Sequence, residues 1–230
     1  AQPIASAPAL ALRAAGEAGI RICNVPDYGT YEVADHAMGL LLAVARKINA
    51  LSDGLRQGPQ NWDWALCRPV GRLWGRTLGI VGFGRIGMAL AQRARAFGLR
   101  IVFYDPYVPD GRDKALGVER AETLEALMPQ CDFLSLHCPL TPETRHILSR
   151  ERIALLKPGA MVINTARGPC CDTVALLEAL RDGRIAGAGL DVLEVEPPAT
   201  QDIFRAFAAR APETANLVLT PHSAFFSEEG

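Results

Sequence analysis

The chain has 230 residues, of which 49% are hydrophobic and 21% are charged, a composition that excludes a disordered chain and fits one large or two small globular domains. Its 24 lysines and arginines nearly balance its 25 aspartates and glutamates, for a formal net charge of −1; no basic surface for nucleic acid or an anionic membrane is expected. The longest apolar run, residues 37–45, is too short to span a membrane, which takes roughly 18 residues.

The first residues contain neither an initiator methionine nor a basic segment followed by an apolar one, so no signal peptide is predicted. The cysteines form no C-x-x-C pair, and no histidine stands at zinc spacing from two of them; they are Cys23, Cys67, Cys131, Cys138, Cys170 and Cys171. We therefore expect reduced thiols, a cytoplasmic protein and no metal site.

The first elements come from residues 1–76. Residues 9–17 have a helical pattern, and residues 19–24 are typical of a short strand. Apolar residues recur every three or four positions over residues 32–55, which predicts one long amphipathic helix with Thr30 as its N-cap. Residues 57–76 contain three tryptophans among glycines and prolines, which indicates a loop held in place by its aromatic side chains.

From Arg76 onwards, short apolar runs alternate with helical stretches. The expected strands are 77–81, 100–104, 133–136, 161–164, 188–192 and 217–220. The expected helices are 85–97, 121–128, 149–156 and 173–182. This alternation predicts an α/β fold of the Rossmann type, in which helices cover both faces of a doubly wound parallel sheet.

A G-x-G-x-x-G motif follows the first of these strands, at Gly82, Gly84 and Gly87. A strand before the motif and a helix after it are the context of a dinucleotide-binding turn. The first glycine permits the tight turn, the second lets the backbone approach a pyrophosphate, and the third lets helix and strand pack closely. Free N–H groups at the helix start then face the phosphates. Arg85 either adds a positive charge there or is a solvated surface residue.

Asp105 ends the next strand, close to the roughly 20 residues after the motif at which a ribose-binding acid is expected. A carboxylate there accepts hydrogen bonds from the ribose hydroxyls and repels a 2′-phosphate. Pro106 follows it, rather than an arginine that would pair with such a phosphate. The pattern therefore favours NAD over NADP.

Three other polar residues follow expected strands. Arg167, Glu196 and His222 each come shortly after a strand end, and the carboxyl ends of parallel strands face the ligand crevice in this architecture. His36 lies inside the long predicted helix, where we expect a structural or interfacial role.

Several separated motifs are typical of one family: GIVGFGRIG at 79–87, HCPLT at 137–141, NTARG at 164–168, GLDVLEVEP at 189–197 and TPH at 220–222. From about residue 20 to residue 230 the chain resembles the NAD-dependent D-isomer-specific 2-hydroxyacid dehydrogenases. Residues 221–228 are most similar to the branch that includes C-terminal-binding-protein-like members. Phe225 stands where the corepressors of that branch have tryptophan.

The resemblance implies hydride transfer between NAD(H) and a small 2-hydroxy or 2-keto acid of the D-isomer series. It assigns His222 to proton exchange with the substrate oxygen, a role worth roughly 10²- to 10⁴-fold in rate. Glu196 would orient the imidazole and favour its protonated form. Arg167 would bind the substrate carboxylate with its planar fork of donors.

The resemblance also implies the cofactor contacts beyond the glycines and Asp105. Asp191 would meet the nicotinamide carboxamide, and Arg85 and Ile86 lie within the glycine-rich turn. The wall of the cofactor pocket would consist of His137, Cys138, Pro139, Thr165 and Ala166.

In the family, the chain begins in a substrate domain of flavodoxin-like fold, crosses into the nucleotide domain and returns after the catalytic histidine. The resemblance therefore implies a remnant of the substrate domain at 1–26, the NAD-binding domain at 27–222 and the start of the return at 223–230. Two explanations stay open: a fragment of a longer enzyme, which the missing methionine favours, or a complete but degenerate NAD-binding protein.

Family members pack the segment that corresponds to 32–55 across a two-fold axis, which implies a homodimer; packing within the chain is the alternative. An NAD-responsive, corepressor-like binding protein without turnover is the second candidate function. Enzymes acting on formate or phosphite are a third, less favoured because formate enzymes carry glutamine where this chain has Glu196.

Overall fold

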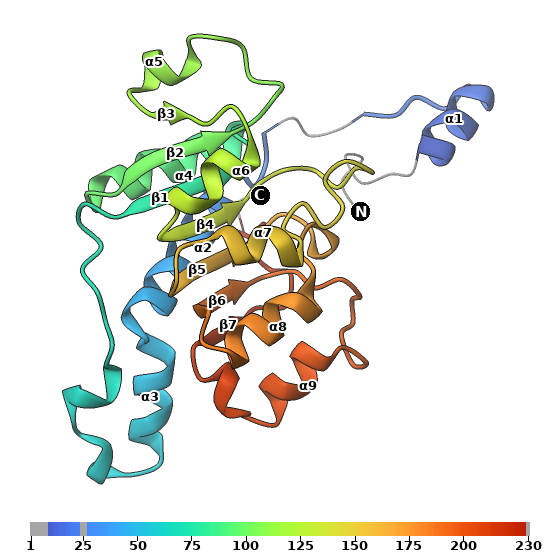
Figure 1. The fold of residues 1–230 in the computed structure, drawn as a ribbon. Coiled ribbons are helices and arrows are strands. Elements are labelled where there is room, and N and C mark those ends of the chain that lie inside the picture. The colour runs from blue at the N-terminus through green and yellow to red at the C-terminus, as the bar shows by residue number, and fades with distance from the viewer. Residues whose placement is uncertain (1–8, 24–26, 229–230) are drawn as a thin grey trace.

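The computed structural model describes residues 9–23 and 27–228. Its centre is a seven-stranded parallel sheet in the order β3-β2-β1-β4-β5-β6-β7 (Figure 1). The strands are β1 (Thr77–Val81), β2 (Arg100–Tyr104), β3 (Glu119–Arg120), β4 (Phe133–Leu136), β5 (Ala160–Asn164), β6 (Ile185–Leu190) and β7 (Leu217–Leu219). The order runs outward from β1 in both directions, which confirms the predicted Rossmann-type fold.

Helices cover both faces of the sheet and form two hydrophobic cores. On one face pack α2 (Thr30–Arg46) and α4 (Arg85–Ala96). On the other pack α6 (Leu124–Leu127), α7 (Arg150–Leu155), α8 (Thr173–Arg181) and α9 (Asp202–Ala208). Successive strand residues serve opposite cores, as strand geometry requires: Ile80 belongs to the first core and Val81 to the second.

Small residues in β6 let α2 lie close to the sheet. A Cβ added at Gly189 would lie 2.9 Å from the Cβ of Leu40, and one at Gly187 would lie 2.6 Å from Cγ1 of Val44. A larger side chain at either glycine would push α2 away from the sheet. The glycines therefore hold α2 against β6, whose carboxyl end leads into the candidate site.

The predicted helix over 32–55 is wrong, because the structure has two helices there. Lys47 has a left-handed backbone with φ of 54°, and it separates α2 from α3 (Ile48–Arg56). A left-handed residue breaks the helical hydrogen-bond ladder, yet the apolar spacing continues on both sides of it. The predicted cap is also wrong: Gly29 is the N-cap and Thr30 is the first helical residue.

Two further expectations in the first third of the chain fail. Residues 20–23 have no regular structure, since no described strand runs beside them, and Asn24 lies outside the described residues. The tryptophan segment contains two short 3₁₀ helices, η2 (Pro59–Asn61) and η3 (Trp64–Cys67). Trp62 and Trp64 do not hold it in place, because their exposed fractions are 84% and 71%. The ring of Trp74 is 73% exposed but lies against Gly98, where an added Cβ would come within 2.3 Å of it.

The remaining differences concern short elements and strand ends. The predicted helix 9–17 is present as α1 (Ala9–Glu17), apart from the sheet (Figure 1). Strands β1, β2 and β4 match their predicted bounds, whereas β6 begins three residues earlier than predicted and ends at Leu190. The prediction missed β3, α9 and α5 (Arg112–Leu116). The two-residue β3 and five-residue α5 are too short to show a clear hydrophobic period.

Candidate functional site

The glycine-rich turn joins β1 to α4. Gly82 has a φ of 90°, and a Cβ there would lie 2.6 Å from the backbone nitrogen of Cys138. A Cβ at Gly87 would lie 2.3 Å from the carbonyl oxygen of Gly82, whereas at Gly84 nothing lies within 4 Å. There is thus no room for a side chain at the first and third glycines, whereas the space beside the second glycine is open. A backbone that is open beside the start of α4 suits a phosphate-bearing ligand.

Asp105 lies directly beside this turn, after the end of β2. One carboxylate oxygen accepts a hydrogen bond from the Phe83 backbone N–H at 2.7 Å, and the other accepts one from Tyr107 N–H at 2.9 Å. Each oxygen keeps a further lone pair for a ligand hydroxyl. The backbone therefore holds the predicted ribose-binding acid next to the phosphate turn.

Two buried polar atoms near the carboxyl ends of β4 and β5 have no partner in the described residues. They are Nδ1 of His137 and Oγ1 of Thr165. Nε2 of His137 lies 2.8 Å from Oγ of Ser135, and burial lowers the pKa of His137 to about 4, which keeps the ring neutral near pH 7. Unsatisfied buried polar atoms are costly, so both atoms fit a wall that receives a polar ligand.

His222 and Glu196 form a pair at the adjacent strand ends. Nδ1 of His222 lies 2.7 Å from Oε2 of Glu196, and both side chains are partly exposed. Oε1 of Glu196 accepts a hydrogen bond from the Leu193 N–H at 2.9 Å, which fixes the carboxylate. With Nδ1 engaged by a carboxylate, Nε2 is the nitrogen left to exchange a proton with a ligand.

Arg167 follows β5, the neighbour of β6. It lies at the same end of the sheet as the His222–Glu196 pair, because the three residues follow the carboxyl ends of the adjacent strands β5, β6 and β7. Its guanidinium donates to the carbonyl oxygen of Ala166 at 2.6 Å, and the structure shows no direct contact with His222 or Glu196 among the described residues. Arg167 is therefore positioned near the pair but not joined to it.

Asp191 holds the segment that carries His222, a role that sequence reasoning missed. The side chain is buried, and its Oδ1 accepts hydrogen bonds from Thr220 Oγ1 at 2.5 Å and Ser223 N–H at 3.0 Å. Its Oδ2 accepts one from Ala224 N–H at 2.9 Å. The carbonyl oxygen of Asp191 accepts the His222 N–H at 2.8 Å. These bonds stabilise His222 in a left-handed conformation with φ of 52°.

His36 belongs to the same network. Its Nε2 lies 2.9 Å from Oγ1 of Thr220 and 3.5 Å from Oδ1 of Asp191. The contacts join α2 to the segment after β7, so His36 has a structural role. The sequence separations, 184 residues for His36 and Thr220, explain why no local pattern could reveal this network.

A second network anchors the loop that carries Glu196. Glu194 accepts hydrogen bonds from the Thr173 N–H and hydroxyl at 3.0 and 2.7 Å, and its other oxygen lies 2.9 Å from Nε2 of His146. Burial raises the pKa of Glu194, but the hydrogen bonds from His146 and Thr173 outweigh burial and hold the pKa below its ordinary value. The start of α8 and the loop after β4 thereby support the Glu196 loop.

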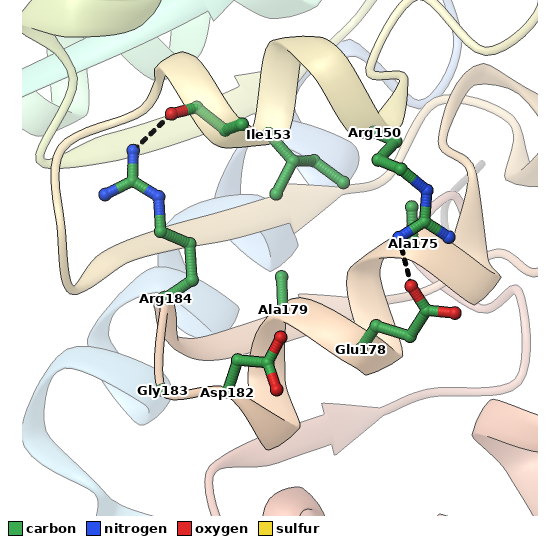
Figure 2. Close-up of a pocket in the computed structure, with 9 residues that line it drawn as sticks. Arg150, Ile153, Ala175, Glu178, Ala179, Asp182, Gly183 and Arg184 are labelled. Carbon is green, nitrogen blue, oxygen red and sulfur yellow. Dashed lines mark hydrogen bonds and ion pairs between the residues drawn. The ribbon is translucent and has the colours of Figure 1, made fainter.

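A groove of about 410 Å³ lies elsewhere, between α7 and α8 (Figure 2). Arg150 and Glu178 form an ion pair at one end of it, and Arg184 binds the carbonyl oxygens of Ala154 and Leu156 at the other. Arg184 directly precedes β6, so this groove borders the amino end of the sheet and contains none of the predicted site residues.

The described residues contain no group of three or more histidine, cysteine or acidic side chains that could hold a metal ion. In the same part of the chain, no helix is long and apolar enough to cross a membrane. All six cysteines are unpaired.

Residues 38–224 match the sequence model of the D-isomer specific 2-hydroxyacid dehydrogenase, NAD binding domain. The chain belongs to this family. The match confirms the predicted family and its cofactor NAD, and the glycine turn, Asp105 and the unpartnered polar atoms of the pocket wall fit that cofactor.

Named relatives agree with this family. The chain is 42% identical to a D-3-phosphoglycerate dehydrogenase of Methanocaldococcus jannaschii and to a glyoxylate reductase of Korarchaeum cryptofilum, covering 95% of this chain in both cases. It spans 40% of the first relative and 64% of the second. The solved structure of the TT0316 protein from Thermus thermophilus matches with a TM-score of 0.82 at 42% identity, over 93% of this chain and 64% of that one.

Proposed function

We propose that the protein is an NAD-dependent D-2-hydroxyacid dehydrogenase, which transfers a hydride between NAD(H) and a small 2-hydroxy or 2-keto acid. The observation that carries the proposal is the His222–Glu196 pair, joined at 2.7 Å at the strand ends of an NAD-binding domain. The names of the relatives, a phosphoglycerate dehydrogenase and a glyoxylate reductase, support the substrate class.

The proposed chemistry divides among three side chains. NAD(H), when bound, supplies or accepts the hydride. In the direction of reduction, protonated His222 gives its Nε2 proton to the substrate carbonyl oxygen, and in the reverse direction the neutral ring takes the hydroxyl proton. Glu196 orients the ring through Nδ1 and stabilises the imidazolium. Arg167 binds the substrate carboxylate and so orients the carbonyl.

We assign the cofactor to the turn of Gly82, Gly84 and Gly87 and to Asp105. Arg85 and Ile86 are assigned to the same turn, and Asp191 to the nicotinamide carboxamide. The pocket wall is proposed to consist of His137, Cys138, Pro139, Thr165 and Ala166. The unpartnered Nδ1 of His137 and Oγ1 of Thr165 support this assignment because they offer polar groups to a bound nicotinamide or ribose.

Asp105→Arg is expected to raise the preference for NADPH over NADH by at least about tenfold, because it removes the acceptor for ribose hydroxyls and provides a cation for a 2′-phosphate. The two dissociation constants are measured by quenching of tryptophan fluorescence. Asp182→Arg, which makes the same charge change at the amino end of the sheet, is the control. An unchanged NADPH-to-NADH ratio in Asp105→Arg would contradict the ribose assignment.

Turnover tests the proposed function. The full-length protein is expected to oxidise NADH in the presence of glyoxylate, pyruvate or hydroxypyruvate. The loss of NADH absorbance measures the reaction. If the protein bound NADH but oxidised it with none of the three substrates, the proposal would be overturned and the NAD-responsive, corepressor-like binding protein would be favoured.

We infer a homodimer that buries the segment from α2 to η3. Large apolar side chains are exposed along this segment; they are Tyr31, Ile48, Leu55, Trp62, Trp64 and Leu66. In Figure 1, α2 lies against the sheet, whereas α3 and the chain after it extend away from it. An exposed apolar patch of this kind is typical of a protein interface.

The double variant Trp62→Ser/Trp64→Ser is expected to convert the dimer to a monomer at micromolar concentration, because the two indoles supply most of the apolar area of η3 and its flank. Sedimentation velocity measures the change. Tyr107→Ser removes an equally exposed ring, at 79%, elsewhere on the domain and should leave the dimer intact. A dimeric double variant would exclude this interface.

We also propose that residues 1–26 and 223–230 border a second, substrate-binding domain, with residues 27–222 as the nucleotide domain. Ile20, Ile22 and Phe226 are exposed at 61%, 40% and 69%, and this supports a contact surface at both junctions. A cytoplasmic location is proposed on the ground that the six cysteines are unpaired.

A further inference from the structure

The loop of residues 105–110 follows the carboxyl end of β2 and begins with Asp105, the proposed ribose-binding acid. Pro106 and Pro109 within it have no backbone N–H. Fewer main-chain hydrogen bonds can therefore hold this loop than an ordinary loop of the same length, and a side chain from the neighbouring strand takes over part of this role.

Arg120 is that side chain. It ends the edge strand β3, which pairs in parallel with β2 so that Arg120 stands beside Phe103. Its guanidinium donates hydrogen bonds to the carbonyl oxygens of Val108 at 3.2 Å and Asp105 at 3.3 Å, and to Oδ1 of Asp110 at 3.1 Å. One planar group thus bonds the loop at its start, its middle and its end.

The guanidinium of Arg120 bonds the carbonyl oxygen of Asp105 and not its carboxylate. The carboxylate accepts hydrogen bonds from the N–H groups of Phe83 and Tyr107 instead. Because only 18% of the Arg120 side chain is exposed, it has little surface left for a ligand. Asp105 is fixed both at its carbonyl oxygen and at its carboxylate, so the carboxylate has little freedom to move.

We propose that Arg120 is a positioning residue that sets the preference for NAD over NADP by holding the loop 105–110 in place. In the held loop, the Asp105 carboxylate accepts hydrogen bonds from the ribose hydroxyls and repels a 2′-phosphate. In a loosened loop, the carboxylate would bind the ribose less well and would be free to turn away from a 2′-phosphate. The inference rests on the proposed ribose contact of Asp105.

A direct effect of the Arg120 charge on the cofactor would have the opposite sign. A cation attracts the additional phosphate of NADPH, so its removal would weaken NADPH binding more than NADH binding. The ratio of the NADPH to the NADH dissociation constant would then rise. Loss of the support of the loop weakens NADH binding more and lowers this ratio. The direction in which the ratio changes therefore separates the two roles.

Two variants of the full-length protein test the proposal, by fluorescence titration with NADH and with NADPH. Arg120→Met keeps an unbranched side chain but has no hydrogen-bond donor. Arg120→Lys keeps the charge, yet an ammonium group cannot reproduce the planar fork that joins two carbonyl oxygens. We expect Arg120→Met to raise the NADH dissociation constant about 3- to 10-fold and to lower the ratio at least about threefold. Arg120→Lys should lower the ratio in the same direction by a smaller factor.

Arg95→Met is the matched control. Arg95 also donates a hydrogen bond from its guanidinium to a loop carbonyl oxygen, that of Leu116 at 2.7 Å. It lies in the last turn of α4, at the opposite end of that helix from the glycine-rich turn. Arg95→Met removes the same charge and the same kind of bond, and it should change the ratio less than about twofold.

An unchanged or raised ratio in Arg120→Met would overturn the proposal. If Arg120→Met did not fold, the ratio in Arg120→Lys would decide in the same way, because that variant keeps the charge. The Asp105→Arg variant locates a failure. If Asp105→Arg lowered the ratio and neither Arg120 variant did, only the role of Arg120 would be refuted. If Asp105→Arg also left the ratio unchanged, the ribose assignment itself would be refuted.

Discussion

His222→Ala is expected to lower kcat by about 10²- to 10⁴-fold, because the variant has no group at Nε2 to exchange a proton with the substrate oxygen. The affinity for NADH should change little, since the proposed contact of the imidazole is with the substrate. Stopped-flow or steady-state kinetics give kcat, and fluorescence titration gives the NADH dissociation constant. Phe226→Ala removes an exposed side chain from the same segment and is the control for local disturbance.

The partner of His222 gives a second measurement. Glu196→Gln keeps the size of the side chain that binds Nδ1 at 2.7 Å but removes its charge, so the imidazolium loses stabilisation. In the direction of reduction, where the protonated ring acts, kcat should fall while the NADH dissociation constant stays unchanged. A His222→Ala variant with the turnover of the wild-type protein would refute the acid–base assignment.

Asp191→Asn is expected to lower kcat by about 10²-fold, because a displacement of roughly 1 Å at a reacting group has an effect of that size. The carboxylate accepts donors from Thr220, Ser223 and Ala224 on its two oxygens. An amide in its place would set an NH₂ group against an N–H or O–H donor. The unfolding free energy should fall by about 1–3 kcal/mol, given the cost of a buried donor left without an acceptor.

Thr220→Val is the matched control for Asp191→Asn, since it removes one hydroxyl donor and leaves the carboxylate and both N–H donors in place. Thr220→Val should lower the unfolding free energy by only about 1 kcal/mol. Urea unfolding and steady-state kinetics give the two quantities, with NADH affinity measured in parallel. If Asp191→Asn weakened only NADH binding and kept kcat, the support of His222 by Asp191 would be refuted, and only its proposed contact with the nicotinamide would stand.

The motif-bearing parts of the fold were predictable because their signals are local. Strands β1, β2 and β4 are short apolar runs bounded by turn residues, and the glycines of the dinucleotide turn need only their immediate neighbours to be recognised. The strand-end positions of Arg167, Glu196 and His222 followed from the rule that ligands meet the carboxyl ends of parallel strands.

Other features depend on contacts that no local pattern contains. The break at Lys47 was not predicted, because the apolar residues keep their helical spacing on both sides of it. The spacing of apolar residues does not depend on the backbone conformation of a single residue. The exposure of Trp62 and Trp64 contradicts the ordinary expectation that aromatic side chains pack inside.

Residue types and their spacing along the chain were enough to predict a parallel sheet with a dinucleotide turn, the family, and a histidine, a glutamate and an arginine at strand ends. The distances among those groups, and the partners that hold them, came only from the folded chain. His36, Asp191 and Thr220 meet across separations of up to 184 residues. Hydrogen bonds act over a few ångströms in space, so they depend on how the chain is folded and not on the order of its residues.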